Sequence, residues 1–316
     1  MMNGIEKQGE FWEDQRAQAD RQELVELIRR AIPEDGKVEP IAGLVLQRAS
    51  APGEPLYVVT APSFCVIAQG SKEIILRNES YTYDPFHYLL VTAELPLTGT
   101  IREASPEHPY LSLRLILDPA LVHSVMVEAR DASPEFADIK AITVSPLCGD
   151  LLNAVVRLAR LIARPSEAPF MAPIIKREIV YRLWMEGQGD RLRHIAAHGG
   201  FVSPIARAIT LLRKKFDQPL RIEKIAQECG MSVSSFHHHF KSVTSMTPLQ
   251  FQKQLRLQEA RRLMLHEHLD AAEAGFRVGY DDASHFNRDY KRHFGMPPRR
   301  DVERLRMVPP SRVEQY

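Results

Sequence analysis

The spacing of apolar residues divides the chain into two parts of different character. Between residues 41 and 117 the apolar residues come in short runs: IAGLVLQRA, PLYVVT, SFCVIAQ, KEIILR, HYLLVTAE, GTIREA and YLSLRLIL. Breaks such as Ala51-Pro52-Gly53 and Arg77-Asn78-Glu79 separate them. Short β-like runs between turn residues are typical of antiparallel strands. The pattern predicts seven or eight strands that form a β-sandwich or a small barrel.

Helical patterns flank this β region on both sides. Residues 21–32 have helical spacing, and the sequence Pro33-Glu34-Asp35-Gly36 ends it. Asp118 followed by Pro119 predicts a second helix start, with a capping carboxylate and a proline at the first helical position. A further helix is expected over 173–185, ended by the glycine-bearing sequence that follows.

The helix expected over 147–162 has two possible interpretations. Leu151, Val155, Leu158 and Ile162 recur at 4-3-4 spacing, so they form one narrow apolar stripe. The stripe packs on its own domain, or it forms a coiled-coil-like seam with a second copy of the chain. The polar stretch from Glu186 to Gly200 contains several glycines and is the expected hinge between the two parts.

The C-terminal part is helical and contains an internal repeat. IAQECGMSVSSFHHHFKSVTSMTP begins at Ile225, and AGFRVGYDDASHFNRDYKRHFGMPP begins at Ala274. In each copy a short helix, a glycine turn and a second helix with an apolar i,i+4 pair match the helix-turn-helix pattern of proteins that read the major groove. We expect about seven helices here, including a long one over 247–265 that joins the two copies. The apolar pairs predicted to face inward are Phe236 with Phe240 and Phe286 with Tyr290.

The outward faces of the second helix of each copy carry the candidate DNA contacts. Ser232 and Asp282 are the expected N-caps of these two reading helices. The guanidinium of Arg288 can donate two hydrogen bonds to guanine, and the amide of Asn287 can pair with adenine. The outward-facing residues, which are the candidates for base contacts, include Ser234, His237, His238, Ala283, Ser284, Asn287 and Arg288. The expected phosphate contacts are Ser232, Lys241, Asp282, Lys291, Arg292 and Arg299.

Charge separates the same two parts. Residues 201–316 carry 20 Lys and Arg against 13 Asp and Glu, whereas residues 1–200 are net acidic and the whole chain is +1. This asymmetry indicates that the C-terminal part meets a polyanion. The three cysteines are far apart and form no CxxC pair, which favours a reducing cytoplasm. No apolar run approaches the ~18–20 residues needed to cross a bilayer, so no membrane partner is expected.

These residues resemble the AraC family of bacterial transcription regulators, and GYDDASHFNRDYKRHFGMPPRR is similar to that family's C-terminal signature. The stretch from Ser63 to Gly99, with YLSLRLILDP after it, is similar to the cupin-type sensing domain of one AraC subgroup. Two departures from the family pattern stand out. Ser and His occupy the first reading helix where many members have larger or cationic side chains. Ala274-Gly275 replaces a bulkier pair, and a helical glycine costs about 1 kcal/mol relative to alanine, which predicts a loose helix.

The resemblance implies a two-domain α+β protein with a cupin-like barrel and flanking helices, followed by an all-α domain with two helix-turn-helix motifs joined by a long helix. The expected divisions are a tail and helix at 1–35, an effector-sensing domain at 36–146, a helical dimerisation and linker region at 147–200, and a DNA-binding domain at 201–316, with motifs at about 220–244 and 270–294. The implied function is a transcription regulator, more often an activator than a repressor. Its implied partners are promoter DNA, an unknown small effector, RNA polymerase, and a second copy bound through 147–185.

The β region contains the candidate effector contacts, which are Cys65, Gln69, His87 and Arg114. Cys65 is either a small buried apolar residue or a ligand contact. Arg114 lies in an alternating apolar strand, so it faces either solvent or a cavity, and an inward arginine favours an anionic or carbonyl ligand.

The sequence also bears on whether the β region is an enzyme. Catalytic cupins hold a metal with a His-x-His pair, whereas residues 41–117 contain only His87 and His108, which form no such pair. The three consecutive histidines from His237 to His239 point about 100° apart on a helix and cannot face one ion. We therefore expect no metal, no other cofactor and no enzymatic activity. One alternative is a cupin-like enzyme fused to a DNA-binding module. Another is a DNA-repair methyl acceptor, but this would need an activated, metal-held cysteine, and the isolated cysteines argue against it.

Overall fold

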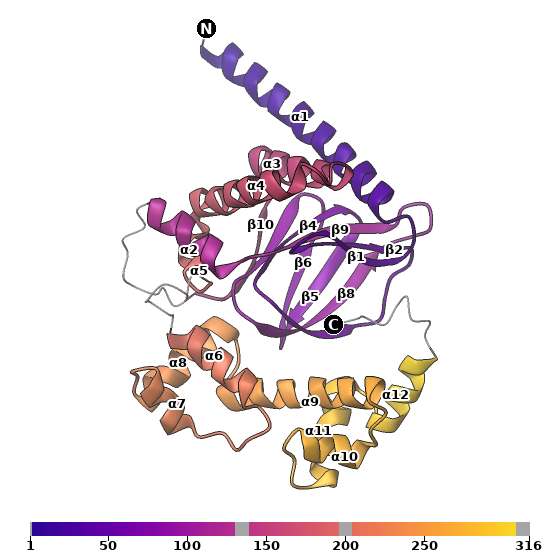
Figure 1. Cartoon of the computed structure of the whole chain (residues 1–316), viewed down its shortest axis with the longest axis vertical. Helices are drawn as coiled ribbons and strands as arrows, with labels where there is room; N and C mark the ends of the chain where they lie inside the picture. Colours follow the sequence, from indigo (N-terminus) through magenta and orange to yellow (C-terminus); the bar gives the residue numbers. More distant parts are fainter. Residues whose placement is uncertain (1, 130–138, 196–203, 308–316) are drawn as a thin grey trace. The chain divides into compact units, whose positions relative to one another are not determined.

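The chain folds into a β-rich unit and an all-helical unit. The structure, a computed structural model, describes residues 2–129, 139–195 and 204–307, with side chains described from Trp12 onward (Figure 1). One unit is built mainly from residues before Pro204 and the other mainly from Pro204 onward. The predicted two-domain α+β fold class is therefore confirmed.

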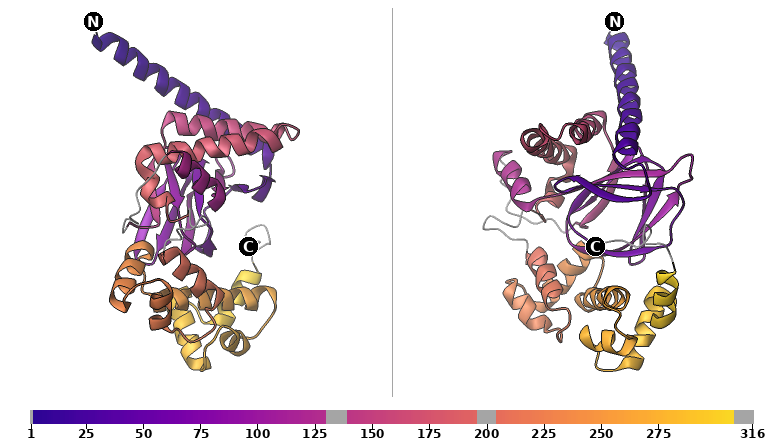
Figure 2. Two further views of the ribbon diagram at one scale, coloured as in Figure 1. Left: turned by 60° about the vertical axis from the view of Figure 1, so that its left-hand side comes forward. Right: turned by 45° about the vertical axis from the view of Figure 1, so that its right-hand side comes forward.

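Two sheets form the framework of the β-rich part of the chain, and the strand pairs of the six-stranded sheet are antiparallel (Figure 2). The six-stranded sheet has the order β1 (Gly36–Ile41), β2 (Leu44–Ala49), β9 (Tyr110–Ile116), β4 (Ser63–Gln69), β7 (His87–Val91) and β10 (Ile142–Pro146). The four-stranded sheet has the order β3 (Leu56–Thr60), β8 (Leu95–Glu103), β5 (Ser71–Leu76) and β6 (Glu79–Tyr83).

Strands β1, β6 and β10 were not predicted from the sequence. Each of them lies at an edge of its sheet. Edge strands are half exposed, and they are often short and polar. GKVEPI in β1 and ESYTY in β6 therefore lack the continuous apolar run that marks the central strands.

The helices of the first unit share one hydrophobic core with the six-stranded sheet. They are α1 (Met2–Ala31), α2 (Pro119–Glu128), α3 (Gly149–Arg160), a 3-10 turn (Leu161–Ala163), α4 (Ala168–Leu183), a wide turn (Trp184–Gln188) and α5 (Gly189–Leu192). Asp118 is the N-cap of α2, as predicted, and its carboxylate accepts a hydrogen bond from the Leu121 N–H at 2.9 Å. Helices α3 and α4 lie side by side across the outer face of the sheet (Figures 1 and 2).

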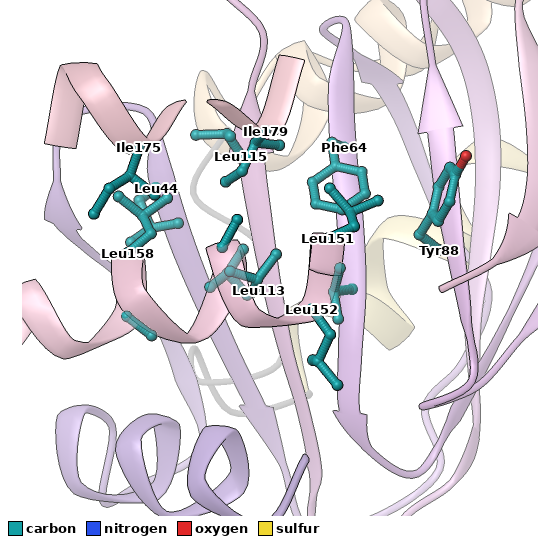
Figure 3. Close-up of a cluster of buried hydrophobic side chains, with 14 of the residues drawn as sticks. Leu44, Phe64, Tyr88, Leu113, Leu115, Leu151, Leu152, Leu158, Ile175 and Ile179 are labelled. Carbon is teal, nitrogen blue, oxygen red and sulfur yellow. The ribbon is translucent and has the colours of Figure 1, made fainter. Parts of the chain in front are cut away.

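The apolar stripe of α3 belongs to the core of its own unit. Leu151 and Leu158 are fully buried. Figure 3 shows them in one cluster with Leu113 of β9 and Ile179 of α4. The interpretation of this stripe as a dimer seam is therefore wrong, because the alternating apolar residues of the sheet already cover it.

The first part of the predicted hinge belongs to the packed first unit. Gly187 adopts φ +78° and turns the chain, but Gln188 is buried and Leu192 and Ile195 belong to the core. The segment up to Ile195 is therefore packed within the first unit. The remaining part of the predicted hinge, 196–200, lies outside the described residues.

Seven helices make up the described part of the second unit, residues 204–307. They are α6 (Pro204–Lys214), α7 (Ile222–Glu228), α8 (Val233–Thr244), α9 (Pro248–His266), α10 (Ala271–Arg277), α11 (Ala283–Phe294) and α12 (Pro298–Arg306). Thr247 and Gln250 form a capping box at the start of α9, so this long helix begins where the sequence predicts. Phe236, Phe240, Phe286 and Tyr290 are fully buried, which confirms both helix-turn-helix pairs.

Candidate functional site

Helix α8 is the first candidate reading helix. The Ser232 hydroxyl caps it by accepting a hydrogen bond from the Ser235 N–H at 3.2 Å. Because Phe236 and Phe240 turn one face inward, Ser234, His238 and Lys241 are exposed on the other, while His237 is partly buried. The predicted base-facing residues of this helix therefore lie on an accessible polar surface.

Helix α11 presents a similar but more cationic surface. Ser284, Asn287, Arg288 and Lys291 are exposed, and Ala283 is partly buried near the start of the helix. The Asp282 carboxylate caps the helix by accepting a hydrogen bond from the His285 N–H at 2.6 Å. A carboxylate repels a phosphate, so we assign Asp282 the role of a cap rather than of a phosphate contact.

Two further predicted phosphate contacts are highly exposed. The side chain of Arg292 is 76% exposed and lies 4.0 Å from the Asp289 carboxylate. Arg299 is 88% exposed and pairs with Glu303 at 3.0 Å one helical turn away. Exposed ion pairs contribute about 0–1 kcal/mol, so Arg299 can exchange this partner for a phosphate at little cost.

One buried carboxylate on the flank of α11 was not predicted from the sequence. Asp289 is 3% exposed, and its Oδ2 atom lies 2.5 Å from Nζ of Lys253 and 3.3 Å from Nε2 of His285. The hydroxyl of Tyr280 lies 3.4 Å from the same oxygen atom. The helical spacing from Phe286 to Asp289 places the carboxylate on the flank of the buried face and could have indicated it. His285, 58% exposed, thereby joins the accessible surface of α11.

The expectation that Gly275 loosens α10 is wrong. Gly275 is buried, and a Cβ atom added there would lie 2.9 Å from Cγ of Phe286. Glycine therefore allows the aromatic ring to approach the backbone of α10 closely. The ring of Phe286 also lies edge-on to Tyr280, with ring centroids 5.3 Å apart.

A second polar cluster lies on the inner face of the β unit. Cys65 of β4 and Arg114 of β9 are directly opposite each other in the antiparallel register. Tyr110 and Ser112 share a strand face with Arg114, because side chains alternate along a strand. The hydroxyl of Tyr110 hydrogen-bonds to Tyr83 of the other sheet, so this face points between the sheets.

Burial controls the ionisation of this cluster. Burial raises the pKa of the Cys65 thiol, and Arg114 opposes the shift without reversing it. Burial also raises the pKa of Tyr83 and of Tyr110. The thiol therefore stays protonated near neutral pH, as expected for a small buried residue and not for a nucleophile.

The other two candidate effector contacts have local partners instead. The side-chain amide of Gln69 donates to the carbonyl of Pro109 at 2.8 Å. Nδ1 of His87 lies 2.8 Å from Oδ1 of Asp84, at the start of β7. The structure thus brings Cys65 together with Arg114, but not with these two. Tyr83, Tyr110 and Ser112 were missed, although the alternating pattern of YLSLRLI places Tyr110 and Ser112 on the face of Arg114.

The described residues also bear on metals and membranes. Among them, no group of three or more His, Cys, Asp or Glu side chains is arranged to hold a metal ion. None of the helices within the described ranges combines the length and apolarity that a bilayer span requires.

Comparisons with known proteins agree with both units. Residues 40–191 match the AraC-type transcriptional regulator N-terminus, and residues 225–304 match a helix-turn-helix domain. The HTH-type transcriptional regulator ArgR of Pseudomonas aeruginosa is 24% identical over 159 residues, which cover 50% of this chain and 48% of ArgR. The HTH-type transcriptional activator RhaS of Salmonella schwarzengrund is 26% identical over 150 residues, covering 47% of this chain and 53% of RhaS. The chain thus spans about half the length of the curated relatives it matches.

A solved structure extends the likeness in fold. ToxT of Vibrio cholerae, crystallised with an unsaturated fatty acid, matches 88% of this chain and all of its own with a TM-score of 0.53 at 13% identity. At this identity the likeness concerns the fold alone. The two family matches, the relatives and the paired helix-turn-helix units agree, and the chain belongs to the AraC family of transcription regulators.

Proposed function

We propose that the chain binds double-stranded promoter DNA through α8 and α11 and regulates transcription in response to a small molecule bound in the β unit. The observation that carries the proposal is the repeated architecture of the two reading helices. Each has a side-chain N-cap, a buried aromatic pair and an exposed polar face. Because bacterial promoters lie in the cytoplasm, we propose that the protein acts there.

The two helices are proposed to contribute unequally to recognition. Arg288 and Asn287 of α11 offer two-point donors and acceptors that distinguish guanine and adenine in the major groove. The exposed face of α8 has Ser234 and His238, and its cation is Lys241. We propose that α11 supplies most of the base discrimination, while α8 supplies a smaller share. Lys241, Lys291, Arg292 and Arg299 are proposed to hold phosphates.

The test is a titration of the full chain against duplexes that it selects from a random-sequence library. Fluorescence anisotropy at increasing salt should give specific dissociation constants of about 10⁻⁸ M or tighter near physiological salt. A scrambled duplex of the same length is the control and should bind at least about a thousandfold more weakly. The proposal fails if no duplex binds even at low ionic strength. The enzyme alternative has no support among the relatives, which are transcription regulators.

The effector is proposed to bind between the sheets beside Arg114. This arginine makes no ion pair with a described carboxylate, and it faces Cys65, Tyr83 and Tyr110. A guanidinium in this setting favours a carboxylate or carbonyl group, which it can bind with two parallel hydrogen bonds. The neutral tyrosine hydroxyls would supply further donors.

A panel of small carboxylic acids and their matching amides tests the effector site. At least one acid should raise the melting temperature of the first unit, and the Arg114→Gln variant should lose that increase. Arg102→Gln is the matched control, because Arg102 lies on β8, is 54% exposed and pairs with Glu73. An increase that persists in the Arg114 variant would contradict the site.

The chain is also proposed to dimerise through α4 and to contact RNA polymerase when bound at a promoter. Phe170, Ile174, Tyr181 and Met185 are 79%, 59%, 46% and 61% exposed. Their spacing puts them on one side of α4 and the turn after it, where a second copy could cover them symmetrically. The variant with Phe170→Glu and Ile174→Glu should be monomeric by light scattering, while Val127→Glu on α2 should not change the mass. A dimer that survives the first variant would place the interface elsewhere.

A further inference from the structure

The two helix-turn-helix units are joined by more than the backbone of α9. Residues 216–218 lie in the loop before α7, and Gly279 lies in the turn between α10 and α11. A Cβ atom added at Gly279 would lie only 2.0 Å from the backbone oxygen of Asp217, and Gly279 has φ +91°. The loop that leads into the first helix-turn-helix unit therefore packs directly on the turn of the second helix-turn-helix unit.

One arginine side chain bridges this contact. From the middle of α9, Arg256 donates through Nε to the carbonyl of Phe216 at 2.6 Å. Its Nη2 atom donates to the carbonyls of Asp217 and Gln218 at 3.1 and 3.0 Å. Its Nη1 atom donates to the carbonyl of Gly279 at 2.6 Å. The planar guanidinium thus binds carbonyls of both helix-turn-helix units at fixed angles.

Further contacts hold the loop and the arginine in the same place. One helical turn before Arg256, the buried amide of Gln252 donates to the carbonyls of Phe216 and Gln218 at 2.9 and 2.7 Å. The side chain of Phe216 packs against the core of the second helix-turn-helix unit, beside residues from α9, α10 and α11. The centroid of the Tyr280 ring lies 5.8 Å from the guanidinium carbon of Arg256.

We propose that Arg256 is a positioning residue that sets the spacing between the two DNA sites read by α8 and α11. Because its guanidinium fixes the loop and the turn together, the two reading helices move as one body. A rigid pair of this kind accepts two major-groove sites at one separation and one rotational phase. This inference rests on the proposed DNA-binding function, and it concerns the geometry of the site rather than its existence.

The first experiment measures tolerance to spacing. A duplex selected by the full chain is footprinted to locate the two contact tracts, and one to five base pairs are then inserted between them. The wild-type chain should lose at least tenfold in affinity with two or more inserted pairs. Arg256→Gln should bind the original duplex more weakly than the wild type does. The fold-loss in affinity caused by an insertion, however, should be at least three times smaller for Arg256→Gln than for the wild type. Arg262→Gln is the matched control, because Arg262 lies on the same helix and pairs with Glu259 and Glu267.

The second experiment needs no DNA. Spin labels at Ser234→Cys and Ser284→Cys, with the exposed Cys148 replaced by serine, report the distance between α8 and α11. The distribution should be narrow in the wild-type background and in Arg262→Gln, and broad in Arg256→Gln. If Arg256→Gln unfolds, Arg256→Lys and Gln252→Met weaken the same contacts more gently and should show the same trend.

The outcomes separate the two proposals. Failure of the wild-type chain to bind any duplex would overturn the proposed function, whatever the label distances are. Tight binding with insertions tolerated, or a broad distance distribution in the wild-type background, would overturn the role of Arg256. Equal loss on insertion for Arg256→Gln and the wild type would do the same.

Discussion

Arg261 of α9 and Asp301 of α12 form a buried ion pair. Nε of Arg261 donates to Oδ2 of Asp301 at 2.8 Å, and Nη2 donates to Oδ1 at 3.0 Å. The hydroxyl of Tyr290 donates to the same Oδ2 atom at 2.9 Å. The carboxylate is completely buried and the arginine is 10% exposed. Three helices, α9, α11 and α12, therefore depend on one carboxylate.

Replacing this carboxylate should destabilise the second unit strongly. Asp301→Asn leaves the guanidinium of Arg261 buried without a counter-charge, which costs about 3–5 kcal/mol. Denaturant unfolding of the full chain measures the loss. Glu303→Gln, which breaks an exposed pair on the same helix, should cost less than about 1 kcal/mol. A loss below about 1 kcal/mol for Asp301→Asn would contradict the role given to this pair.

Removing the Arg288 side chain should relax base discrimination. Arg288→Ala should weaken specific binding by about 1–3 kcal/mol and flatten the preference at one base position. Competition between the selected duplex and its single-base variants measures both effects. An unchanged preference at every position would show that Arg288 does not read a base.

Removing the Lys291 charge should act differently. Lys291→Ala should weaken binding to all duplexes to a similar extent, and the slope of log affinity against log salt should fall by about 1. The measurement is a salt titration with the selected and the scrambled duplex. A loss confined to the selected duplex would move Lys291 from a phosphate to a base.

The ion pair between Arg157 of α3 and Glu178 of α4 should make the stability of the first unit sensitive to acid. Burial acts to raise the pKa of Glu178, but hydrogen bonds from Arg157 and Arg182 outweigh it, so the pKa lies below its ordinary value. A carboxylate with a lowered folded pKa stabilises the fold above its unfolded pKa, and this contribution is lost as the pH falls through the folded value.

Glu178→Gln therefore should destabilise the first unit by about 1–3 kcal/mol at neutral pH. The difference from the wild type should shrink as the pH falls below about 4, the ordinary range of a glutamate. Unfolding curves across this pH range measure it. Glu167→Gln is the control, because the Glu167 side chain is 51% exposed and pairs with Arg164. The stability difference between this variant and the wild type should depend little on pH. A constant difference for Glu178→Gln would contradict the argument.

Adding a methyl group at Gly275 should destabilise the second unit. Alanine gains about 1 kcal/mol in helix propensity over glycine. The added Cβ would overlap Phe286, and overpacking of this kind costs about 1–3 kcal/mol, so we expect the overlap to prevail. Gly149→Ala is the control, because its Cβ would meet Ala17 at an ordinary 3.9 Å. Thermal unfolding distinguishes the two, and a stabilised Gly275→Ala would show that Phe286 can move aside.

The two helix-turn-helix units could be predicted from the sequence because their determinants are local. The caps Ser232 and Asp282 act on backbone groups three residues away. The aromatic pairs at i,i+4 mark the buried face of each helix, so the exposed positions followed from helix geometry. The charge asymmetry and the signature after Gly279 then identified the family.

The remaining features depended on which distant segments meet, and only the tertiary structure decided them. The apolar spacing of α3 fits both packing in the core and a dimer interface. The sheet that buries Leu158 comes from residues far earlier in the chain. Gly275 indicates a weak helix in the sequence, but in the folded chain it makes room for the ring of Phe286. Arg256 and Asp289 resemble ordinary surface charges in the sequence, because their roles arise from carbonyls and side chains brought close by folding. Local backbone preferences act within one helical turn and can be read from the sequence, whereas packing partners are set by the fold as a whole.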